Sequence, residues 1–381
     1  KGTHCVKWEY VSQSIKGAPH DVLPLWVADM DFPCAQPILD ALRCRVDRRI
    51  FGYSNPYTKG YLSAVLNWFQ SRYEWTIDPD RILVTPGVVP AVGILIRALT
   101  REGEGVIVQQ PVYYPFFSII RQNGRIIVNN PLIRQNGRYE IDFDDLEQKA
   151  ADPANTMMIF CSPHNPVGRV WKDWELARVA DICRRHHLIL VADEIHCDLT
   201  RRGVKFVPMA KAAPHETLIS CTAPSKTFNL AGLQISNTIF HSEDMRRQCA
   251  LELREKLGLF GANPLSIVAT EAAYTRGREW LDQILSYIDD NLAFIGDFIS
   301  VHMPGVGYRV PQGTYLAWLD LRRYDRPWDA LKKALLTEAK VALDDGDMFG
   351  EEGRGFERIN AACPRSILTD CLRRMAAILA C

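Results

Sequence analysis

The sequence carries no excess of charge of either sign. Its 381 residues include 45 lysines and arginines and 45 aspartates and glutamates, so the formal net charge is zero. Proteins that bind nucleic acid or an anionic membrane surface through bulk electrostatics carry a clear positive excess. The composition therefore gives no reason to expect either partner.

Long apolar runs, metal-binding patterns and repeats are also missing. No run approaches the ~20 apolar residues of a membrane span, and no signal peptide is visible. The eleven cysteines are an odd number, lie scattered in apolar stretches and show no zinc-binding spacing. We therefore expect a reduced, cytoplasmic protein without a metal site. Because the sequence starts at Lys1, we also expect a few residues to precede it.

Short apolar runs alternate with amphipathic stretches from about residue 81 to residue 240. Continuous hydrophobicity suits strands that are covered on both faces, as in a mainly parallel α/β sheet. The length predicts about two domains, at roughly 150 residues each. The runs are residues 82–84, 105–108, 157–160, 188–191, 218–220 and 237–240.

The C-terminal third has a different pattern. Apolar residues recur at steps of three or four from Trp280 to Ile299, which predicts a long amphipathic helix that links the large domain to a smaller one. A short strand at 315–319 and helices at 328–341 and 367–379 then predict a compact α+β domain.

Lys226 is the residue that most restricts the possible catalytic chemistry. It follows an apolar run, residues 218–222, that predicts a buried strand, and Ala231 and Gly232 after it let other groups approach closely. The amine of a lysine at the end of a core strand can form a Schiff base, and desolvation lowers its pKa towards neutrality. A lone lysine could equally extend to solvent, so the assignment depends on the other motifs.

Four further strand ends carry groups that suit one planar, anionic ligand. Free N–H groups at Val88 and Val89, after a glycine turn, would form an anion site. Tyr113 could stack on a ring, and Asn165 lies in a turn bracketed by prolines. Asp193 directly follows an apolar strand, where a carboxylate needs a cationic partner.

These groups together match pyridoxal 5′-phosphate. This cofactor has an aldehyde, a ring nitrogen that is best kept protonated, a π face, a phenolic oxygen and a phosphate. Each motif alone also fits an ordinary turn or packing role. Their joint occurrence in this order favours the cofactor.

Several segments also match the motifs of a known family. They are residues 25–33, 51–53, 86–90, 163–171, 193–196, 225–234 and 358–365. On these motifs the sequence resembles fold-type I pyridoxal-phosphate enzymes over essentially its whole length. The lysine motif is diagnostic of the superfamily. The segment Asp29-Met30-Asp31-Phe32-Pro33, with His196 and Gln234, points to the cystathionine β-lyase or cysteine-S-conjugate β-lyase branch, the MalY/PatB type.

The resemblance implies an α/β architecture, the PLP-dependent transferase (aspartate aminotransferase-like) fold. The large cofactor-binding domain would be residues 45–275, with a mainly parallel seven-stranded sheet. Residues 1–44 and 276–381 would form the smaller α+β domain. The resemblance further implies a homodimer with shared active sites and a small-molecule amino-acid substrate.

It also implies a role for each matched residue. Lys226 would be the Schiff-base lysine, Asp193 would pair with the pyridinium nitrogen, and Tyr113 would stack on the ring. Asn165 would donate to the phenolic oxygen, and His196 lies where related aminotransferases carry a tyrosine with that task.

The remaining implied roles concern the phosphate and the substrate. The phosphate ligands would be the backbone of Val88 and Val89, Ser225, and Tyr53 of the neighbouring subunit. The substrate α-carboxylate would be clamped by Arg358, helped by backbone near Ala28 and by Asn165.

The sequence departs from the family pattern at several positions. Gln234 stands where many family aminotransferases carry a phosphate-binding arginine, so backbone amides would do more of the work. Ala223 stands where a serine or threonine is common. Ser162 and residues 312–315 also differ from the family pattern. The resemblance places them on the substrate side of the site, so the identity of the substrate stays open.

The activity that the resemblance implies is α,β-elimination from L-cystathionine or a related L-cysteine S-conjugate. The products would be a thiol, pyruvate and ammonia, with Lys226 removing the Cα proton. Transamination stays open, because it needs the same Lys226, Asp193 and Arg358, although Gln234 and His196 favour the lyase. A regulatory, protein-binding role on the same fold is the second alternative.

Overall fold

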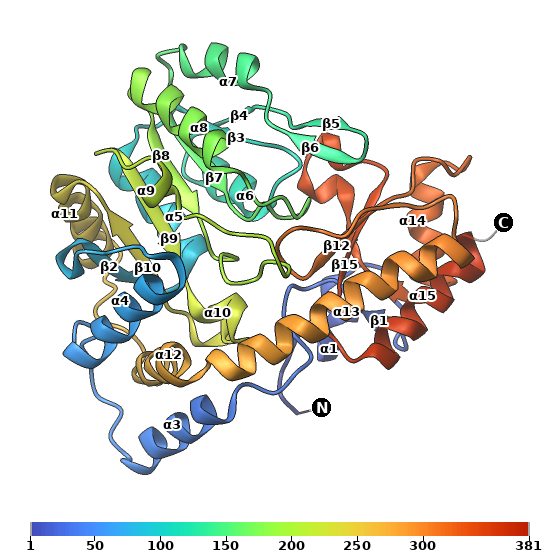
Figure 1. The fold of residues 1–381 in the computed structure, drawn as a ribbon, viewed down its shortest axis with the longest axis horizontal. Helices are drawn as coiled ribbons and strands as arrows, with labels where there is room; N and C mark the ends of the chain where they lie inside the picture. The colour runs from blue at the N-terminus through green and yellow to red at the C-terminus, as the bar shows by residue number, and fades with distance from the viewer. Residues whose placement is uncertain (1, 380–381) are drawn as a thin grey trace.

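A seven-stranded sheet forms the centre of the larger part of the structure, a computed structural model that describes residues 2–379 (Figure 1). The expectation about residues before Lys1 lies outside this range. Neighbouring strands run parallel, except that β10 is antiparallel to both β2 and β9. The mainly parallel seven-stranded sheet is therefore confirmed. Its order is β2 (Ile82–Thr85), β10 (Ser236–Phe240), β9 (Leu218–Thr222), β8 (Ile189–Asp193), β7 (Asn155–Cys161), β3 (Gly105–Val108) and β4 (Ile126–Asn129).

The apolar runs predicted six of these strands, and each run lies within or within one residue of its strand. The seventh strand, β4, was missed because it lies at the edge of the sheet. Ile126 at its start is 57% exposed, and its other residues are only partly buried. An edge strand does not need the continuous hydrophobicity of a central one.

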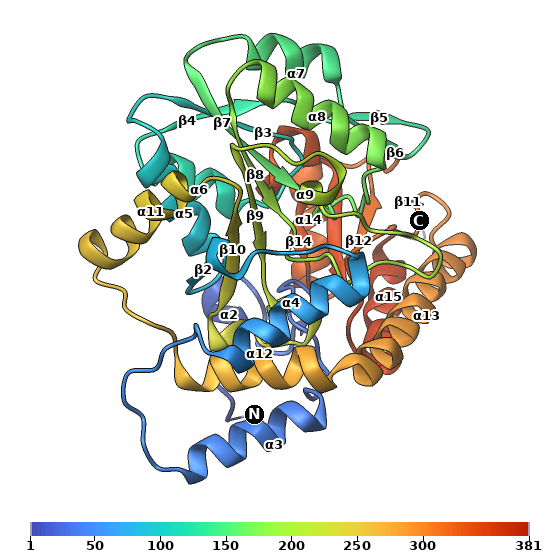
Figure 2. The same ribbon diagram turned by 60° about the vertical axis from the view of Figure 1, so that its left-hand side comes forward.

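Helices cover both faces of this sheet, as Figure 2 shows. Alternate residues of a strand point to opposite faces. Met157 and Ile159 of β7 therefore pack in the cluster of α5 (Val88–Leu99), α6 (Pro115–Gln122) and α11 (Glu243–Leu251). Met158 and Phe160 pack in the cluster that includes α4 (Lys59–Tyr73), α7 (Phe143–Ala150), α8 (Asp173–Arg185) and α12 (Pro264–Arg276). Both faces are apolar, which explains the continuous runs in the sequence.

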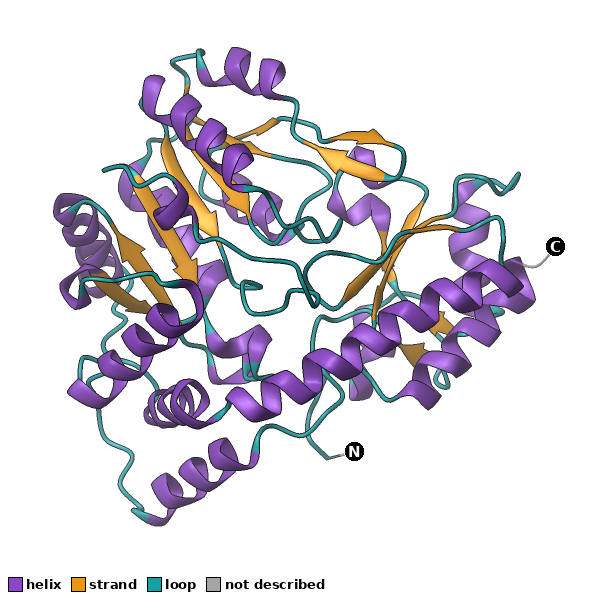
Figure 3. Cartoon of the chain, in the orientation of Figure 1, coloured by secondary structure: helices purple, strands orange, loops and turns teal. Residues whose placement is uncertain are grey.

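A second, antiparallel sheet organises the smaller part, shown with its helices in Figure 3. Its strand order is β11 (Gly307–Tyr308), β12 (Leu316–Asp320), β15 (Phe356–Asn360) and β14 (Asp344–Asp345). The long linking helix predicted from the apolar stripe is α13 (Arg278–His302). It packs with α14 (Trp328–Thr337) and α15 (Arg365–Leu379). Helix α14 ends before residue 341 because Lys340 has a left-handed φ of 51° and the next residues form β13 (Val341–Ala342).

The N-terminal segment joins the smaller part through β1 (Leu23–Pro24), which pairs in parallel with β13. Helix α3 (Gln36–Asp47) packs instead on α12 of the larger part. The predicted boundary at residue 44 falls inside α3, and the division into 45–275 and 1–44 with 276–381 stays a prediction. Within residues 2–379, no helix is both long and apolar enough to cross a membrane.

Short elements complete the described chain. They are α1 (Val6–Glu9), α2 (Val11–Ser14), η1 (Pro79–Arg81), β5 (Ile133–Gln135), β6 (Arg138–Glu140), α9 (Met209–Ala212), α10 (Pro224–Thr227), η2 (Ala231–Leu233), η3 (Glu252–Lys256), η4 (Gly346–Phe349) and η5 (Glu351–Gly353).

Candidate active site

A cavity of about 240 Å3 lies beyond the carboxyl ends of the central strands. In open α/β sheets this is the edge at which ligands bind. Most of the predicted site residues line it: Ala28, Val88, Val89, Tyr113, Asn165, Asp193, His196, Ser225 and Lys226. Arg358 and Tyr53 are not among its lining residues. We call this space the Lys226 cavity.

Lys226 lies in α10, a single helical turn that starts two residues after β9 ends. The sequence had placed it directly at a strand end. Its Nζ donates to the carbonyl oxygen of Ala28 at 2.8 Å and lies 3.8 Å from Oδ1 of Asp29. Burial lowers the pKa of the Lys226 amine, and the nearby Asp29 carboxylate opposes that effect. The amine is therefore easier to deprotonate than that of a surface lysine.

Asp193 is the last residue of β8, a central strand. Cys161 and Cys221 occupy the register positions opposite it on the two neighbouring strands, so apolar walls flank the carboxyl group. Its Oδ1 accepts a hydrogen bond from the Ile195 N–H at 3.2 Å. Burial raises the pKa of Asp193 from 3.8 to about 7, although that hydrogen bond and the charge of Lys226 both lower it. Such a carboxylate is stabilised by any cationic group that enters the cavity.

Arg358 lies on β15 and is 2% exposed. Its Nη1 donates to Oδ1 of Asn165 at 2.9 Å, while Nη2 donates to the Trp26 carbonyl oxygen at 3.1 Å and pairs with Asp344. The Trp26 and Asp344 contacts fix the guanidinium, whereas help from backbone near Ala28 in binding the substrate carboxylate stays a prediction. The contact with Asn165 places the guanidinium next to a residue that lines the Lys226 cavity.

The same contact orients the Asn165 side chain. Its oxygen is engaged by Arg358, and its Nδ2 group forms no hydrogen bond within residues 2–379. The NH2 group is thus free to donate to a ligand oxygen.

The N-terminus of α5 has the backbone geometry that suits the predicted anion site. Gly87 precedes the helix with a φ of 114°, a conformation that a residue with a Cβ rarely adopts. The N–H groups of Val88 and Val89 lie in the first turn, where no intrahelical acceptor is available. Ser225 and Gln234 line the same cavity. Lys226 is the only lysine or arginine among the described residues that line it, so an anion bound here would depend mainly on backbone dipoles.

Tyr113 and His196 complete the polar wall. The Tyr113 ring packs edge-on against Phe116, with ring centroids 5.6 Å apart. Burial lowers the pKa of His196 to about 3, with the charges of Lys226 and Arg358 acting in the same direction. The imidazole is therefore neutral, and its Nδ1 has no hydrogen-bond partner in the described chain.

Tyr53 lies away from this cavity, on the extended segment between α3 and α4. Its side chain is fully exposed, at 103% of the reference value, and Phe51 beside it is 58% exposed. One protomer alone therefore gives Tyr53 no contact with the predicted phosphate site.

Three residues that the structure brings to the site had no role predicted from the sequence. Asp29 lies near Lys226, Tyr315 donates to the Ala28 carbonyl oxygen at 2.7 Å, and Asp344 pairs with Arg358. Asp29 and Tyr315 stand inside quoted motifs. Asp344 lies in no motif, because its role depends on the pairing of β14 with β15.

The chain belongs to the aminotransferase class I and II family, whose model matches residues 20–374.

Relatives with the same overall length are similar to it. Cystathionine beta-lyase PatB of Bacillus subtilis strain 168 is 41% identical over 380 residues, which cover 99% of this chain and 97% of PatB. Protein MalY of Escherichia coli K12 is 37% identical, over 96% of this chain and 93% of MalY. The crystal structure of cystalysin from Treponema denticola, which contains a pyridoxal 5′-phosphate cofactor, has a TM-score of 0.95. It is 37% identical and covers 100% of this chain and 96% of that one.

Proposed function

We propose that this protein is a pyridoxal-phosphate-dependent carbon–sulfur lyase. It would convert L-cystathionine or a related L-cysteine S-conjugate into a thiol, pyruvate and ammonia. The observation that carries the proposal is the pairing, in one cavity, of a desolvated lysine with a buried carboxylate, Lys226 and Asp193. The similarity to cystathionine beta-lyase PatB supports the same reaction class, and the similarity to cystalysin supports the same cofactor.

The described residues fit the cofactor group by group. The first turn of α5 suits its phosphate. Asp193 suits a protonated ring nitrogen, because no cation among the described residues lies closer to its buried carboxylate than Lys226. The free Nδ2 of Asn165 suits the phenolic oxygen. Tyr113 lines the cavity where a ring face would lie. When bound, pyridoxal phosphate supplies an aldehyde for amines and a ring that accepts the electrons left at Cα.

Lys226 would hold the cofactor through Nζ and would then act on the substrate proton. Its amine is already desolvated, so a larger share of it is neutral than in a surface lysine. A neutral amine in reach of Cα is a general base. The Ala28 carbonyl oxygen, which accepts from Nζ, would orient the amine during this step.

Arg358 would bind the α-carboxylate of the substrate. Its guanidinium is fixed by Asp344 and Trp26, so little side-chain entropy is lost on binding. Apart from Arg358, which contacts the lining residue Asn165, no arginine is placed at the Lys226 cavity among the described residues. A dicarboxylate-specific aminotransferase would need a second cation for the other carboxylate, whereas an S-conjugate of cysteine would not.

We further propose a homodimer in which Tyr53 completes the phosphate site of the partner. The full exposure of Tyr53 and the weakly cationic anion site support this arrangement. We also propose that the protein works in the cytoplasm. The ten cysteines of residues 2–379 are all free, as a reducing compartment would keep them.

The decisive experiment follows the products of L-cystathionine with purified enzyme and no 2-oxoacid. We expect pyruvate, ammonia and thiol in equal amounts. The variant Lys226→Ala should abolish the reaction, whereas Lys333→Ala, which changes an exposed lysine, should leave it intact. Product that forms only when 2-oxoglutarate is added would instead identify an aminotransferase.

A further inference from the structure

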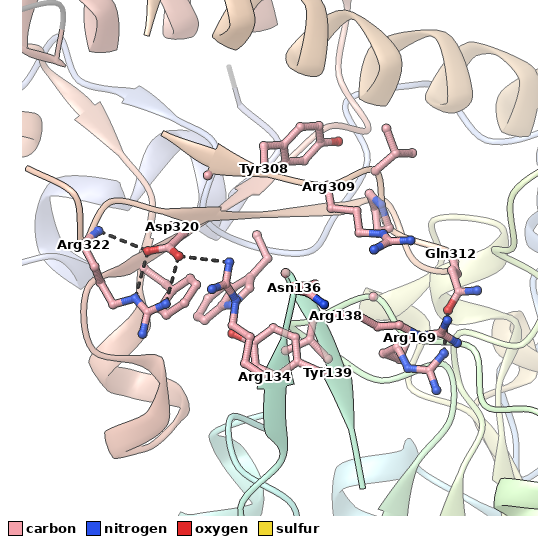
Figure 4. Close-up of a pocket in the computed structure, with 18 of the residues that line it drawn as sticks. Arg134, Asn136, Arg138, Tyr139, Arg169, Tyr308, Arg309, Gln312, Asp320 and Arg322 are labelled. Carbon is pink, nitrogen blue, oxygen red and sulfur yellow. Dashed lines mark hydrogen bonds and ion pairs between the residues drawn. The ribbon is translucent and has the colours of Figure 1, made fainter. Parts of the chain in front are cut away.

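A second cavity, of about 810 Å3, lies between the β5–β6 hairpin and the β11–β12 region of the smaller sheet (Figure 4). It shares no lining residue with the Lys226 cavity. Among the described residues, Asp320 is the only acidic one that lines it. Its cationic lining residues are Arg134, Arg138, Arg169, Arg309, Arg322 and Arg323. We call it the arginine cavity. Six arginines around one space are unusual in a chain with zero net charge.

Most of this positive charge is not neutralised by the protein. Arg134 and Arg322 share the single carboxylate of Asp320, at 3.0 Å and 2.9 Å. Arg169 pairs with the buried Glu175. The other three arginines, Arg138, Arg309 and Arg323, form no ion pair within residues 2–379. The cavity therefore has a strong positive potential that faces solvent.

Two of the six guanidinium groups are also held in place by aromatic rings. Those of Arg134 and Arg322 lie over the Phe356 ring, 5.5 Å and 4.7 Å from its centroid. Trp318 stacks on Phe356 with centroids 5.0 Å apart and donates to the Tyr139 hydroxyl at 3.0 Å. An aromatic base of this kind presets the guanidinium positions, so that less entropy is lost when an anion binds.

Two arginines that line the cavity have a buried nitrogen atom without a partner. Nε of Arg138 and Nε of Arg169 are both buried and have no hydrogen-bond partner in the described chain. The Arg169 side chain is fixed by Gln312, whose Oε1 accepts from Nη1 at 2.9 Å. Gln312 N donates in turn to the Gly168 carbonyl oxygen at 2.8 Å, which ties the two parts of the structure together at this point. A ligand that accepts from these nitrogens would satisfy donors that the chain leaves without partners.

We propose that the arginine cavity binds a compact polyanion that carries two or more phosphate groups. The planar guanidinium fork matches phosphate oxygens in pairs. The volume lies within the range of small-molecule sites, about 300–1,000 Å3. Three unpaired guanidinium groups exceed what a single phosphate or carboxylate needs. The phosphate groups can come from an inorganic polyphosphate or from a nucleoside triphosphate, and both offer the same chemistry to the arginines.

Calorimetric titration with inorganic tripolyphosphate tests the proposal. The enzyme is first saturated with pyridoxal phosphate, so that the anion site at α5 is filled. We expect saturable 1:1 binding that weakens with rising salt. The double variant Arg138→Gln/Arg309→Gln should bind at least about tenfold more weakly, because two charge-assisted contacts are lost. Neither arginine forms an ion pair within residues 2–379, so thermal stability should change little.

The matched control is Arg101→Gln/Arg373→Gln, which removes the same charge from two exposed positions outside the cavity. It should bind like the unaltered protein. ATP is titrated in parallel: affinity equal to that of tripolyphosphate assigns the site to the phosphate chain, and tighter binding adds a nucleoside contact. Absence of saturable binding, or equal losses in the control and in the cavity variant, would overturn the proposal.

Discussion

Replacing Asp193 by asparagine should stabilise the cofactor-free protein, by an amount that grows as the pH rises towards neutrality. Burial raises the pKa of this carboxyl from 3.8 to about 7. Below about pH 4 it is protonated in both the folded and the unfolded chain and imposes no charge penalty. Above about pH 7 it is ionised in both, and the folded chain bears the full cost of the buried charge. Stability is therefore lost as pH rises between these values.

The size of the effect follows from the same values. Each tenfold change in an ionisation constant is worth about 1.4 kcal/mol. The rise from 3.8 to about 7 then gives an upper limit of about 4 kcal/mol for Asp193. An amide has nearly the same shape and can still accept from the Ile195 N–H, so Asp193→Asn recovers most of this cost.

The assay is thermal melting of the cofactor-free protein at pH 5, 6, 7 and 8. Asp193→Asn should raise the melting temperature by several degrees at pH 8 and by much less at pH 5. Asp325→Asn, at an exposed carboxylate, should show no such trend. With cofactor bound, the same variant should lose most of its activity, because an amide cannot stabilise a pyridinium. A gain that is equal at all pH values, or no gain at pH 8, would refute the burial argument.

Borohydride reduction of the yellow holoenzyme should fix the cofactor to a peptide that contains Lys226, and label on another lysine would overturn the assignment. Arg358→Lys should raise KM for the amino acid about 10–100-fold, because the bidentate geometry is lost; an unchanged KM would remove Arg358 from the substrate site. Gln234→Arg should slow the loss of cofactor on dialysis by adding a cation to the anion site; faster loss would contradict the electrostatic account. Mixed dimers of Lys226→Ala and Tyr53→Phe should regain one working site out of two, and no recovery after confirmed subunit exchange would assign Tyr53 to its own chain.

The sequence predicted the fold where each strand is buried on both faces, because such strands are continuously apolar. It missed β4, whose edge position allows exposed residues. The candidate site was predictable in the same way. Residues at the carboxyl ends of parallel strands converge at one edge of the sheet, so Asp193 and Asn165 had to lie together.

The sequence did not predict the contacts that the smaller part of the structure and the N-terminal segment make at the site. The pairing of Arg358 with Asp344 comes from the antiparallel register of β14 and β15. The use of the Ala28 carbonyl by Lys226 depends on how an irregular N-terminal segment crosses the cavity. The arginine cavity could not be predicted from the sequence for a related reason. Its cations come from the hairpin, from the turn after Asn165 and from the smaller sheet, and no run of basic residues marks them.

The weak positive charge of the Lys226 cavity connects phosphate binding with the proposed homodimer. A phosphate brings about two negative charges into a site whose only lysine or arginine, among the described lining residues, is Lys226. That lysine would be occupied by the cofactor and, as a general base, works best when it is neutral. Backbone dipoles at α5 supply only part of the compensation. A further hydrogen-bond donor would add to this compensation, and the described part of the chain leaves Tyr53 fully exposed, close to the exposed Phe51. In the dimer that we propose, that hydroxyl from a second copy would satisfy the phosphate without adding a cation that would compete for the substrate carboxylate.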